Sequence, residues 1–498
     1  MTKAVRRILV TVSVINALLP AVAWATGKKR PVVPVAPIDI SRVTDNAAIG
    51  CIDADVAHKL IKDYGLEMGR FSGSTELCDS KRPGKKMLNA ILMLDQGKFG
   101  PTARAGLDRQ MITTDYATYF RQRIGRVVFD NQCGGTSWVL ACVINSNPVM
   151  HVEKPYFDDD MALALQMTVL VHEARHTEGF PHYRCYTGGN AGKNGACDLS
   201  YEAGGAYAVE VEYETRVALN GLNFNPVFKT MARLFAIDRL NNNFVTAPTT
   251  KKPALFLVDQ ADSHVVVLDR EGHANELSDV VLGKGRLIGR DSGANLMFED
   301  PTREPMYLDY YARKLFPQTA VAPVVGLTMR NYATSWSAAK KQNLVDILND
   351  AAGNGIQIRL FKNQLEAAKG LDNAPVVDLP ATETPVALLS TLPCLTPEGA
   401  SVGFYVRMAS GAIYQIDTSN VPRRAGMSRV ACTWPQDLAS ITRFSGKVVV
   451  LDGEGHLSVL EENGTRSPFP GAPGLAARRF THAVAAELVP ELVSDLVL

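Results

Sequence analysis

The sequence predicts an α+β domain followed by an all-β domain, and three observations support this. The chain has 498 residues, which at roughly 100–200 residues per domain is too long for one ordinary core. Helical hydrophobic periodicity is concentrated in residues 49–248, whereas short apolar runs separated by turn residues dominate residues 254–474. Hydrophobic residues make up 46% of the chain and charged residues 21%. Both regions can therefore bury a core, and a chain disordered throughout is excluded.

The first domain is predicted to combine short strands with helices. Residues 158–178 show a strong apolar repeat at helical spacing, with three aspartates at the start that would cap the helix. Residues 126–130 and 149–157 are predicted strands. Further helices are expected over residues 56–64, 207–219 and 226–241, an extended arm or linker over 26–48, and a second linker over 246–253.

The second domain contains an internal repeat. Residues 265–273 and 448–456 are identical at eight of nine positions, and each copy is a strand that runs into an Asp-x-Glu-Gly-His turn. Their spacing fits four units of about 46 residues, close to common propeller periods. The alternative is a β-sandwich with a repeated hairpin. Other strands are expected at 254–259, 356–360, 403–407 and 412–417, and helices at 335–352 and in a C-terminal tail over 475–498.

The N-terminus predicts an exported protein. Three basic residues precede an apolar run over residues 8–23, which ends in the cleavage pattern Ala23-Trp24-Ala25. We therefore expect residues 1–25 to be a signal peptide, the mature protein to be periplasmic or secreted, and no membrane span to remain after cleavage. The formal net charge of +1 gives no reason to expect a nucleic-acid partner.

Cysteine usage agrees with export. The chain has eight cysteines, an even number, and none lies in a C-x-x-C pair. Disulfides are expected in an oxidising compartment. Pairing neighbours in order is the simplest of about 105 possible connectivities. It would join Cys51 with Cys78, Cys133 with Cys142, Cys185 with Cys197, and Cys394 with Cys432.

One segment carries residues suited to binding a catalytic metal ion. His172 and His176 are one helical turn apart and project from the same face, so both imidazoles can reach one Zn²⁺. Glu173 stands beside the first ligand, where it can act on water without being a ligand itself. Gly179 can end the helix with a positive φ and allow the chain to bring His182 to the same ion. Three imidazoles leave a fourth position open, as in catalytic zinc sites.

The full pattern H-E-x-x-H-x-x-G-F-x-H resembles the zinc motif of the metzincin peptidases, in particular the astacin branch. The match is local to these eleven residues and the helix before them. The resemblance implies a zincin-like catalytic domain, with His172, His176 and His182 as zinc ligands and Glu173 as general base. It also implies a methionine-containing turn beneath the metal, for which Met231 is the nearest candidate, although Met231 lies in a helical pattern.

Several residue roles stay open at this level. A glutamate from a second helix could replace His182 as third ligand, as in thermolysin-like enzymes; the candidates are Glu202, Glu210 and Glu212. Tyr183 or Tyr207 could stabilise the oxyanion or support the ligands. The histidines of the repeated turns, His273 and His456, are expected to be turn residues.

The sequence therefore favours a secreted zinc metallopeptidase that acts on a protein or peptide. Its β domain would bind substrate or a protein or cell-wall partner. The alternative is a non-catalytic exported binding or adhesion protein with a structural or vestigial metal site. A third hypothesis is that the protein is a hydrolase whose substrate is a cell-wall peptide or another amide.

Overall fold

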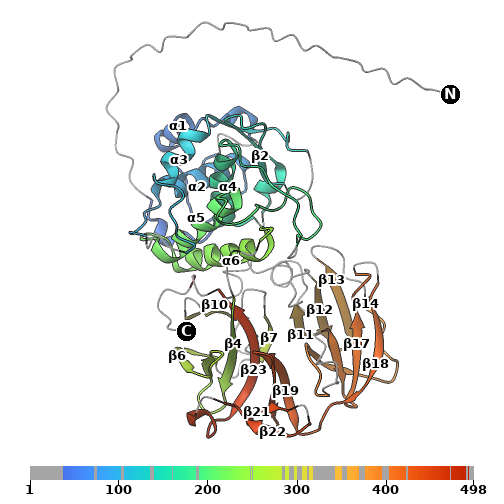
Figure 1. The fold of residues 1–498 in the computed structure, drawn as a ribbon. Coiled ribbons are helices and arrows are strands. Elements are labelled where there is room, and N and C mark those ends of the chain that lie inside the picture. Colours follow the sequence, from blue (N-terminus) through green and yellow to red (C-terminus); the bar gives the residue numbers. More distant parts are fainter. Residues whose placement is uncertain are drawn as a thin grey trace, which may run out of the picture. The chain divides into compact units, whose positions relative to one another are not determined.

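The computed structural model describes residues 38–71, 76–102, 106–134, 139–159, 161–186, 190–246, 248, 251–282, 286–290, 296–299, 306–310, 313–317, 343–349, 356–369, 376–394, 403–421, 424–461, 463–470, 473–489 and 492. Pro37–Leu498 forms one compact unit by its contacts. The predicted signal peptide, the predicted arm up to residue 37 and the segment 335–342 lie outside the described residues. Helices fill the first half of the chain and strands the second, as predicted (Figure 1).

Six α-helices and a small sheet form the described part of the helical region. In the sheet, the central strand β3 pairs in parallel with β1 and antiparallel with β2, which leaves β2 at an edge. The helices are α1 (Ala54–Asp63), α2 (Pro83–Gln96), α3 (Tyr116–Arg123), α4 (Leu163–His176), α5 (Ala206–Asn220) and α6 (Pro226–Asn242). The strands are β1 (Arg126–Phe129), β2 (Ala141–Val143) and β3 (Val149–Val152), and the short 3₁₀ helices are η1 (Ile40–Arg42), η2 (Met68–Arg70) and η3 (Lys154–Phe157).

Helix α4 begins five residues later than the sequence suggests. Its N-cap is Ala162, so the acidic run at 158–160 does not cap it as predicted. Asp159 instead accepts a hydrogen bond from the buried Lys86 Nζ, at 2.9 Å. Most of α4 is buried, because the helix packs against α2, α3, α5 and the sheet edge. The segment that carries the histidine motif is therefore held on several sides.

The described end of the predicted surface arm is packed into the helical core. Ile40 and Val43 are each 1% exposed and belong to the same hydrophobic cluster as α2 and α4. The apolar residues of this segment therefore contribute burial, which a linker would not require. The prediction of a linker or surface arm is therefore wrong for Ile40 and Val43, whereas Ser41 and Arg42 between them are exposed as a surface arm would be.

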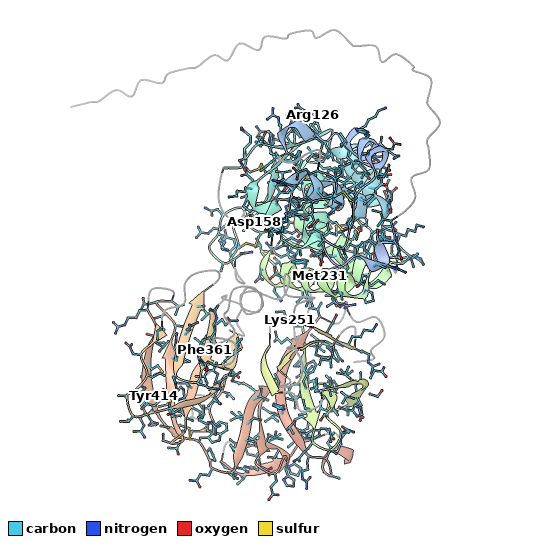
Figure 2. The ribbon with its side chains drawn as sticks, turned by 180° about the vertical axis from the view of Figure 1, so that it is seen from behind. Arg126, Asp158, Met231, Lys251, Phe361 and Tyr414 are labelled. Atoms are coloured by element: carbon cyan, nitrogen blue, oxygen red, sulfur yellow. A yellow bond between two sulfur atoms is a disulfide. The ribbon has the colours of Figure 1, made fainter. Side chains whose placement is uncertain are left out.

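The described part of the β region contains five antiparallel sheets of four strands each. Figure 2 shows Phe361 and Tyr414 on two of these sheets. The sheets run β10-β9-β8-β7, β11-β12-β13-β14, β15-β16-β17-β18, β19-β20-β21-β22 and β23-β4-β5-β6. Their bounds are β4 (Lys252–Asp259), β5 (His264–Leu268), β6 (Ala274–Val281), β7 (Arg286–Arg290), β8 (Leu296–Glu299), β9 (Met306–Asp309), β10 (Lys314–Pro317), β11 (Leu344–Asn349), β12 (Ile356–Phe361), β13 (Gln364–Lys369), β14 (Val376–Val377), β15 (Pro385–Leu389), β16 (Tyr405–Met408), β17 (Ala412–Asp417), β18 (Gly426–Thr433), β19 (Leu438–Phe444), β20 (Lys447–Asp452), β21 (Leu457–Leu460), β22 (Arg466–Pro468) and β23 (Phe480–Leu488), with the 3₁₀ turn η4 at Pro473–Leu475.

Two predicted helices are strands where the structure describes them. The C-terminal tail contains β23, which pairs antiparallel with β4 along nearly its whole length. Within the predicted helix 335–352, Leu344–Asn349 forms β11 and pairs with β12. In both segments a backbone ladder overrides the local helical spacing of the apolar residues: β23 pairs with the sequence-distant β4, and β11 pairs with β12, the next strand along the chain. Both helix predictions are wrong for these residues.

The two repeats form the same local turn in different places of their sheets. Residues 265–268 lie in β5, the third strand of its sheet, whereas 448–451 lie in β20, the second strand of its sheet. Each turn is closed by a glycine N–H that donates to the aspartate carbonyl at 3.1 Å, Gly272 to Asp269 and Gly455 to Asp452. The two copies therefore share the geometry of their hairpin turn, but they occupy different strand positions in their sheets.

Candidate metal centre

The last turn of α4 and the loop after it carry the three histidines of the motif. His172 and His176 lie on α4, and Gly179 follows with a φ of 86°, a left-handed conformation that side chains rarely adopt. The Gly179 N–H donates to the carbonyl oxygen of His176 at 3.0 Å and closes the helix end. The chain then reverses through Phe180 and returns His182 toward the helix. The glycine therefore has the backbone role expected from the sequence.

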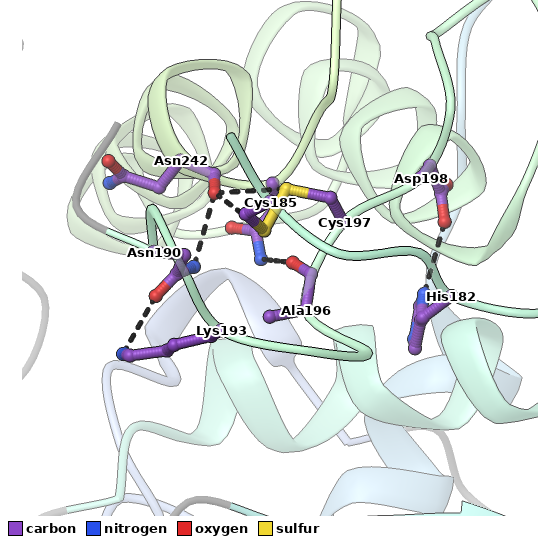
Figure 3. Close-up of a disulfide and its surroundings, with 9 residues drawn as sticks. His182, Cys185, Asn190, Lys193, Ala196, Cys197, Asp198 and Asn242 are labelled. Atoms are coloured by element: carbon purple, nitrogen blue, oxygen red, sulfur yellow. Dashed lines mark hydrogen bonds and ion pairs between the residues drawn. A yellow bond between two sulfur atoms is a disulfide. The ribbon is translucent and has the colours of Figure 1, made fainter. Parts of the chain in front are cut away.

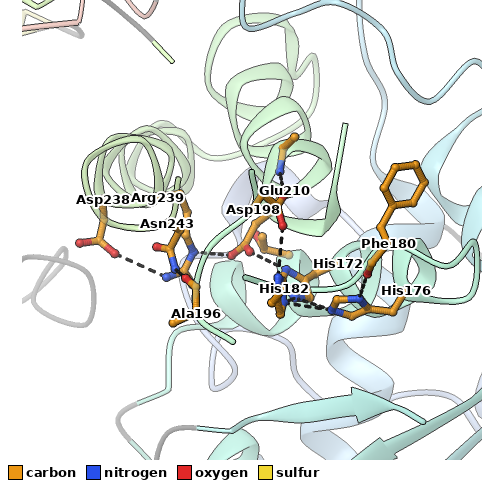
Figure 4. A network of polar contacts seen from close by, with 12 residues as sticks. His172, His176, Phe180, His182, Ala196, Asp198, Glu210, Asp238, Arg239 and Asn243 are labelled. Carbon is orange, nitrogen blue, oxygen red and sulfur yellow. Dashed lines mark hydrogen bonds and ion pairs between the residues drawn. The ribbon is translucent and has the colours of Figure 1, made fainter. Parts of the chain in front are cut away.

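The three imidazoles meet at their Nε2 atoms. The Nε2···Nε2 distance is 3.2 Å between His172 and His176, 3.1 Å between His172 and His182, and 3.1 Å between His176 and His182 (Figure 4). These three residues are also a group whose side-chain donors could hold a metal ion. The structure thus brings together the three histidines that the motif singles out.

Each ring has a partner for its other nitrogen. The Nδ1 atom lies 2.9 Å from Glu210 Oε2 in His172, 2.7 Å from the Phe180 carbonyl oxygen in His176, and 3.2 Å from Asp198 Oδ1 in His182 (Figure 4). A carbonyl oxygen can only accept, so Nδ1 of His176 carries the hydrogen. The carboxylates favour the same tautomer in the other two rings. With Nδ1–H donating outward, each neutral ring directs an Nε2 lone pair at the shared centre.

The electrostatics keep most of this cluster uncharged. Burial, together with the nearby His172 and His182, lowers the pKa of His176 to about 3. Burial also lowers the pKa of His182, against the hydrogen bond to Asp198. For His172, burial is outweighed by the hydrogen bond and charge of Glu210, which raise its pKa. At neutral pH at least two of the three rings are therefore neutral bases that face one another.

This arrangement fits a small divalent cation. Tetrahedral zinc with nitrogen ligands at ~2.0–2.1 Å places those nitrogens about 3.3 Å apart, close to the spacing of the three Nε2 atoms. Lone pairs so close together repel one another unless a proton or cation lies between them. Three imidazole donors suit zinc and related transition metals and are poor ligands for calcium or magnesium.

Glu173 is buried next to this centre. It is 4% exposed, and its Oε2 atom has no hydrogen-bond partner among the described residues. Burial raises the pKa of Glu173 to about 7, opposed by the charge of His172 and by a hydrogen bond from the Val143 backbone on the edge strand β2. A carboxyl group with this pKa can accept and release a proton near neutral pH.

Helices α5 and α6 form a layer behind two of the ligands. The Tyr207 ring stacks on His182 with centroids 4.5 Å apart and meets His172 edge-on at 4.7 Å. Arg239 of α6 donates from Nε to Glu210 Oε1 at 2.7 Å and lies over the Tyr207 ring. Despite burial, Arg239 and His172 lower the pKa of Glu210 to about 2. The acceptor of His172 is therefore held as a charged carboxylate.

The helix end is fixed by a second arginine. Arg175 donates from Nε to the Gly204 carbonyl at 2.7 Å and pairs with Glu178 through Nη1. Its guanidinium lies over the Phe180 ring, 3.9 Å from the centroid. This packing holds the segment whose carbonyl accepts from His176.

Other residues considered from the sequence lie elsewhere. Glu202 is exposed and pairs with Arg109 at 4.0 Å, and Glu212 accepts from Tyr116 Oη at 2.9 Å, so neither joins the three histidines. Glu210 reaches His172 through Nδ1, on the side of the ring away from the centre. Tyr183 is 43% exposed and forms a bridge with Cys197.

Met231 does not lie in a turn. It is buried within α6 and belongs to the helical core (Figure 2). Met231 therefore lies in the helix that its sequence pattern indicates and does not supply the methionine turn that the resemblance implies.

Sequence reasoning missed three contributors to the site: Asp198, Arg239 and the Phe180 carbonyl. Asp198 directly follows Cys197 in a loop, and Arg239 lies in a helix with ordinary apolar periodicity. Asp198 also accepts from the Ala208 N–H at 3.0 Å, which ties its loop to the start of α5. A local pattern could have identified only the Phe180 carbonyl, which lies four residues after His176.

The four predicted disulfides are present. They join Cys51 with Cys78, Cys133 with Cys142, Cys185 with Cys197, and Cys394 with Cys432. Among the residues that the structure describes, no helix has both the length and the hydropathy needed to cross a membrane.

Comparisons with known proteins assign no family to the chain. No protein-family model matches it, and no curated protein matches it. Among solved structures, it is similar to a DUF4784 family protein from Bacteroides caccae (TM-score 0.27, 12% identity, 49% of this chain and 76% of that one). It is also similar to a catalytically inactive variant of virginiamycin B lyase from Staphylococcus aureus bound to quinupristin (TM-score 0.22, 10% identity, 44% and 69%). A third similar structure is PorZ, a surface component of the type-IX secretion system of Porphyromonas gingivalis (TM-score 0.21, 14% identity, 42% and 30%). TM-scores this low do not indicate a shared overall fold.

Proposed function

We propose that this protein is an exported zinc-dependent metallopeptidase. The observation that carries the proposal is the convergence of three Nε2 atoms within 3.1–3.2 Å of one another, with every Nδ1 next to an acceptor. Such a donor set leaves part of the ion's coordination open to water and substrate, which distinguishes catalytic from structural zinc sites. The metzincin-like motif in the sequence supports the same assignment.

The chemistry divides between the ion and Glu173. Zinc bound to the three histidines would supply Lewis-acid chemistry, acidifying a water molecule and polarising the scissile carbonyl. Glu173 takes the proton of the attacking water and later passes it to the leaving amine. Its burial and its pKa of about 7 suit both transfers. Glu210, Asp198 and the Phe180 carbonyl orient the three imidazoles and exclude their other tautomer.

We also infer a zincin-like fold for the metal-binding domain and a propeller-like fold for the β region. The metal-binding helix α4 packs beside the edge strand β2 of a mixed sheet, which supports the first inference. In the β region, the C-terminal strand β23 pairs with β4, the first strand of the region, so one sheet contains both ends of the series. This closure and the five four-stranded sheets among the described residues support a ring of blades. The four disulfides favour an oxidising compartment.

The test compares two glutamate variants of the full mature chain. Glu173→Gln keeps the shape of the side chain but removes the base, so it should retain one zinc per chain and lose at least ~100-fold in kcat for peptide cleavage. The matched control is Glu202→Gln, which removes a charge from an exposed residue outside the three-histidine cluster. Cleavage is measured on a broad peptide library, and zinc by elemental analysis.

The outcomes separate the function classes. Wild-type cleavage that a chelator removes and zinc restores, lost in Glu173→Gln and kept in Glu202→Gln, supports the peptidase. Zinc binding without cleavage of any peptide would favour the binding or adhesion protein instead. Undiminished turnover in Glu173→Gln would remove Glu173 from the role of base.

A further inference from the structure

The third metal ligand and its acceptor stand at the two ends of one disulfide-closed loop. His182 precedes Cys185 by three residues, and Asp198 directly follows Cys197 (Figure 3). The hydrogen bond that sets the tautomer of His182 therefore joins the start of this loop to its end. Neither His172 nor His176 depends on such a loop, since both lie on α4.

The loop ends are drawn together by the disulfide and a short backbone ladder. The Tyr183 N–H donates to the Cys197 carbonyl at 2.6 Å, and the Cys197 N–H donates back to the Tyr183 carbonyl at 3.1 Å. These bonds form a single isolated bridge rather than a strand pair. Both cysteines are 0% exposed, so the disulfide is buried in the packed structure.

The same disulfide rests on the end of helix α6. Its two sulfur atoms lie 3.8 and 3.6 Å from the Asn242 carbonyl oxygen, which also accepts from Asn190 Nδ2 at 3.2 Å (Figure 3). Asn243 donates from Nδ2 to the Ala196 carbonyl at 2.9 Å, and its own carbonyl accepts from the Asp198 N–H at 2.9 Å. The Val245 N–H also donates to the Asp198 carbonyl at 2.9 Å, so the backbone at the end of the loop is paired with the segment that follows α6.

We propose that the Cys185–Cys197 disulfide is a positioning element of the metal centre, so that the site reaches its full zinc affinity only after this bond has formed. The proposal rests on the proposed zinc site. Without the cross-link, the loop must be closed by the Tyr183–Cys197 bridge, by further backbone hydrogen bonds such as that from the Cys185 N–H to the Lys193 carbonyl, and by a few side-chain bonds, at a cost in chain entropy. His182 and Asp198 would then lose their fixed spacing, while His172 and His176 would keep theirs.

The chemistry couples metal loading to the compartment. In the reduced chain the two thiols are oxidised by thiol–disulfide exchange with a disulfide-bearing oxidant. The Cys185–Cys197 bond forms, the oxidant's S–S bond breaks, and its two sulfurs leave as thiols that carry the two protons. A chain in a reducing compartment would therefore hold an incomplete site, and a folded exported chain a complete one.

The test compares matched disulfide deletions in the full mature chain. Cys185→Ala/Cys197→Ala removes the proposed positioning bond and leaves no thiol that could bind the metal. Cys133→Ala/Cys142→Ala removes a disulfide of similar loop length in the same region, whose loop carries no metal ligand. We expect both variants to unfold at lower temperature than the wild type. Zinc affinity, measured by chelator competition, should fall 10–100-fold only in the first variant, and the visible spectrum of bound Co²⁺ should change only there.

A second measurement covers the case in which the first variant does not fold. Denatured and reduced wild type is refolded with zinc, with and without a glutathione redox couple, and disulfides and bound zinc are mapped in the same species by mass spectrometry. Tight zinc retention should follow the Cys185–Cys197 bond. Equal zinc affinity in both double variants, or zinc held tightly by species without this bond, would overturn the proposal. A wild type that binds no zinc would instead refute the proposed function.

Discussion

The motif histidines and the histidines of the two repeated turns are both close to carboxylates, but their surroundings differ. In the candidate metal centre two of the three Nδ1 partners are carboxylates from other segments, Glu210 on α5 and Asp198, and only the Phe180 carbonyl is local. In the turns the partner is local: His273 Nδ1 lies 2.8 Å from Asp269 Oδ2, and His456 Nδ1 lies 3.0 Å from Asp452 Oδ2. His172 is 8% exposed, whereas the side chain of His273 is 77% exposed.

The difference favours a metal site at the three motif histidines over one at the repeated turns. Asp269, Glu271 and His273 also form a group whose donor atoms could meet an ion. However, the Asp269 Oδ1 atom already accepts the His273 N–H at 2.8 Å, so this carboxylate closes the turn. In the centre, the carboxylates of Glu210 and Asp198 and the carbonyl of Phe180 orient the rings so that their Nε2 atoms converge. A short acidic turn with a histidine lacks that support, and we assign it a structural role.

The largest expected effect comes from the third ligand. His182→Ala leaves two imidazoles, so we expect zinc affinity to fall by more than ~100-fold, beyond the effect of removing a hydrogen-bond partner of a ligand. His273→Ala, the matched change in a turn, should leave affinity unchanged. Zinc retained after dialysis against a weak chelator measures both. Full zinc content in His182→Ala would mean that another side chain is the third ligand, and the comparison between centre and turn would fail.

A smaller effect is expected from the support of that ligand. Asp198→Asn keeps the size of the side chain but weakens the acceptor of His182 Nδ1, so zinc affinity should fall 10–100-fold while the ligand set remains intact. Competition with a chromophoric chelator gives the affinity, and the matched control is Asp452→Asn in the second repeated turn. Equal affinities in wild type and Asp198→Asn would show that the tautomer of His182 needs no carboxylate.

The parts that sequence predicted are those set by local geometry. The one-turn spacing of His172 and His176 follows from any helix over the motif, and Gly179 is a residue that allows the reversal after it. Asp198 and Arg239 could not be found in this way, because their contacts exist only once the loop and helix α6 have packed. The helix prediction for the C-terminal tail is wrong for the same reason. The apolar residues of Phe480–Leu488 have helical spacing, but the segment pairs with β4, and a single sequence does not specify that partner.

The smallest effect is expected in a repeated turn and concerns stability rather than metal. Burial alone would raise the pKa of Asp269, but hydrogen bonds from the side chain and backbone of His273 lower it. A lowered carboxyl pKa stabilises the folded chain above the unfolded value of ~3.9, and this contribution is lost as the pH falls through the folded value. Asp269→Asn should therefore lower the stability by less than ~1 kcal/mol at pH 7, since the His273 side chain is 77% exposed and solvent screens its interaction with Asp269. The two proteins should converge as the pH falls through the lowered pKa of Asp269 in the folded chain. Urea unfolding with a chelator present, at pH 7 and over a series of acidic pH values, measures this. A stability difference that persists in acid would show that Asp269 does not act through its charge. A loss of zinc affinity in Asp269→Asn would show that this turn binds metal and would contradict the structural role assigned to it.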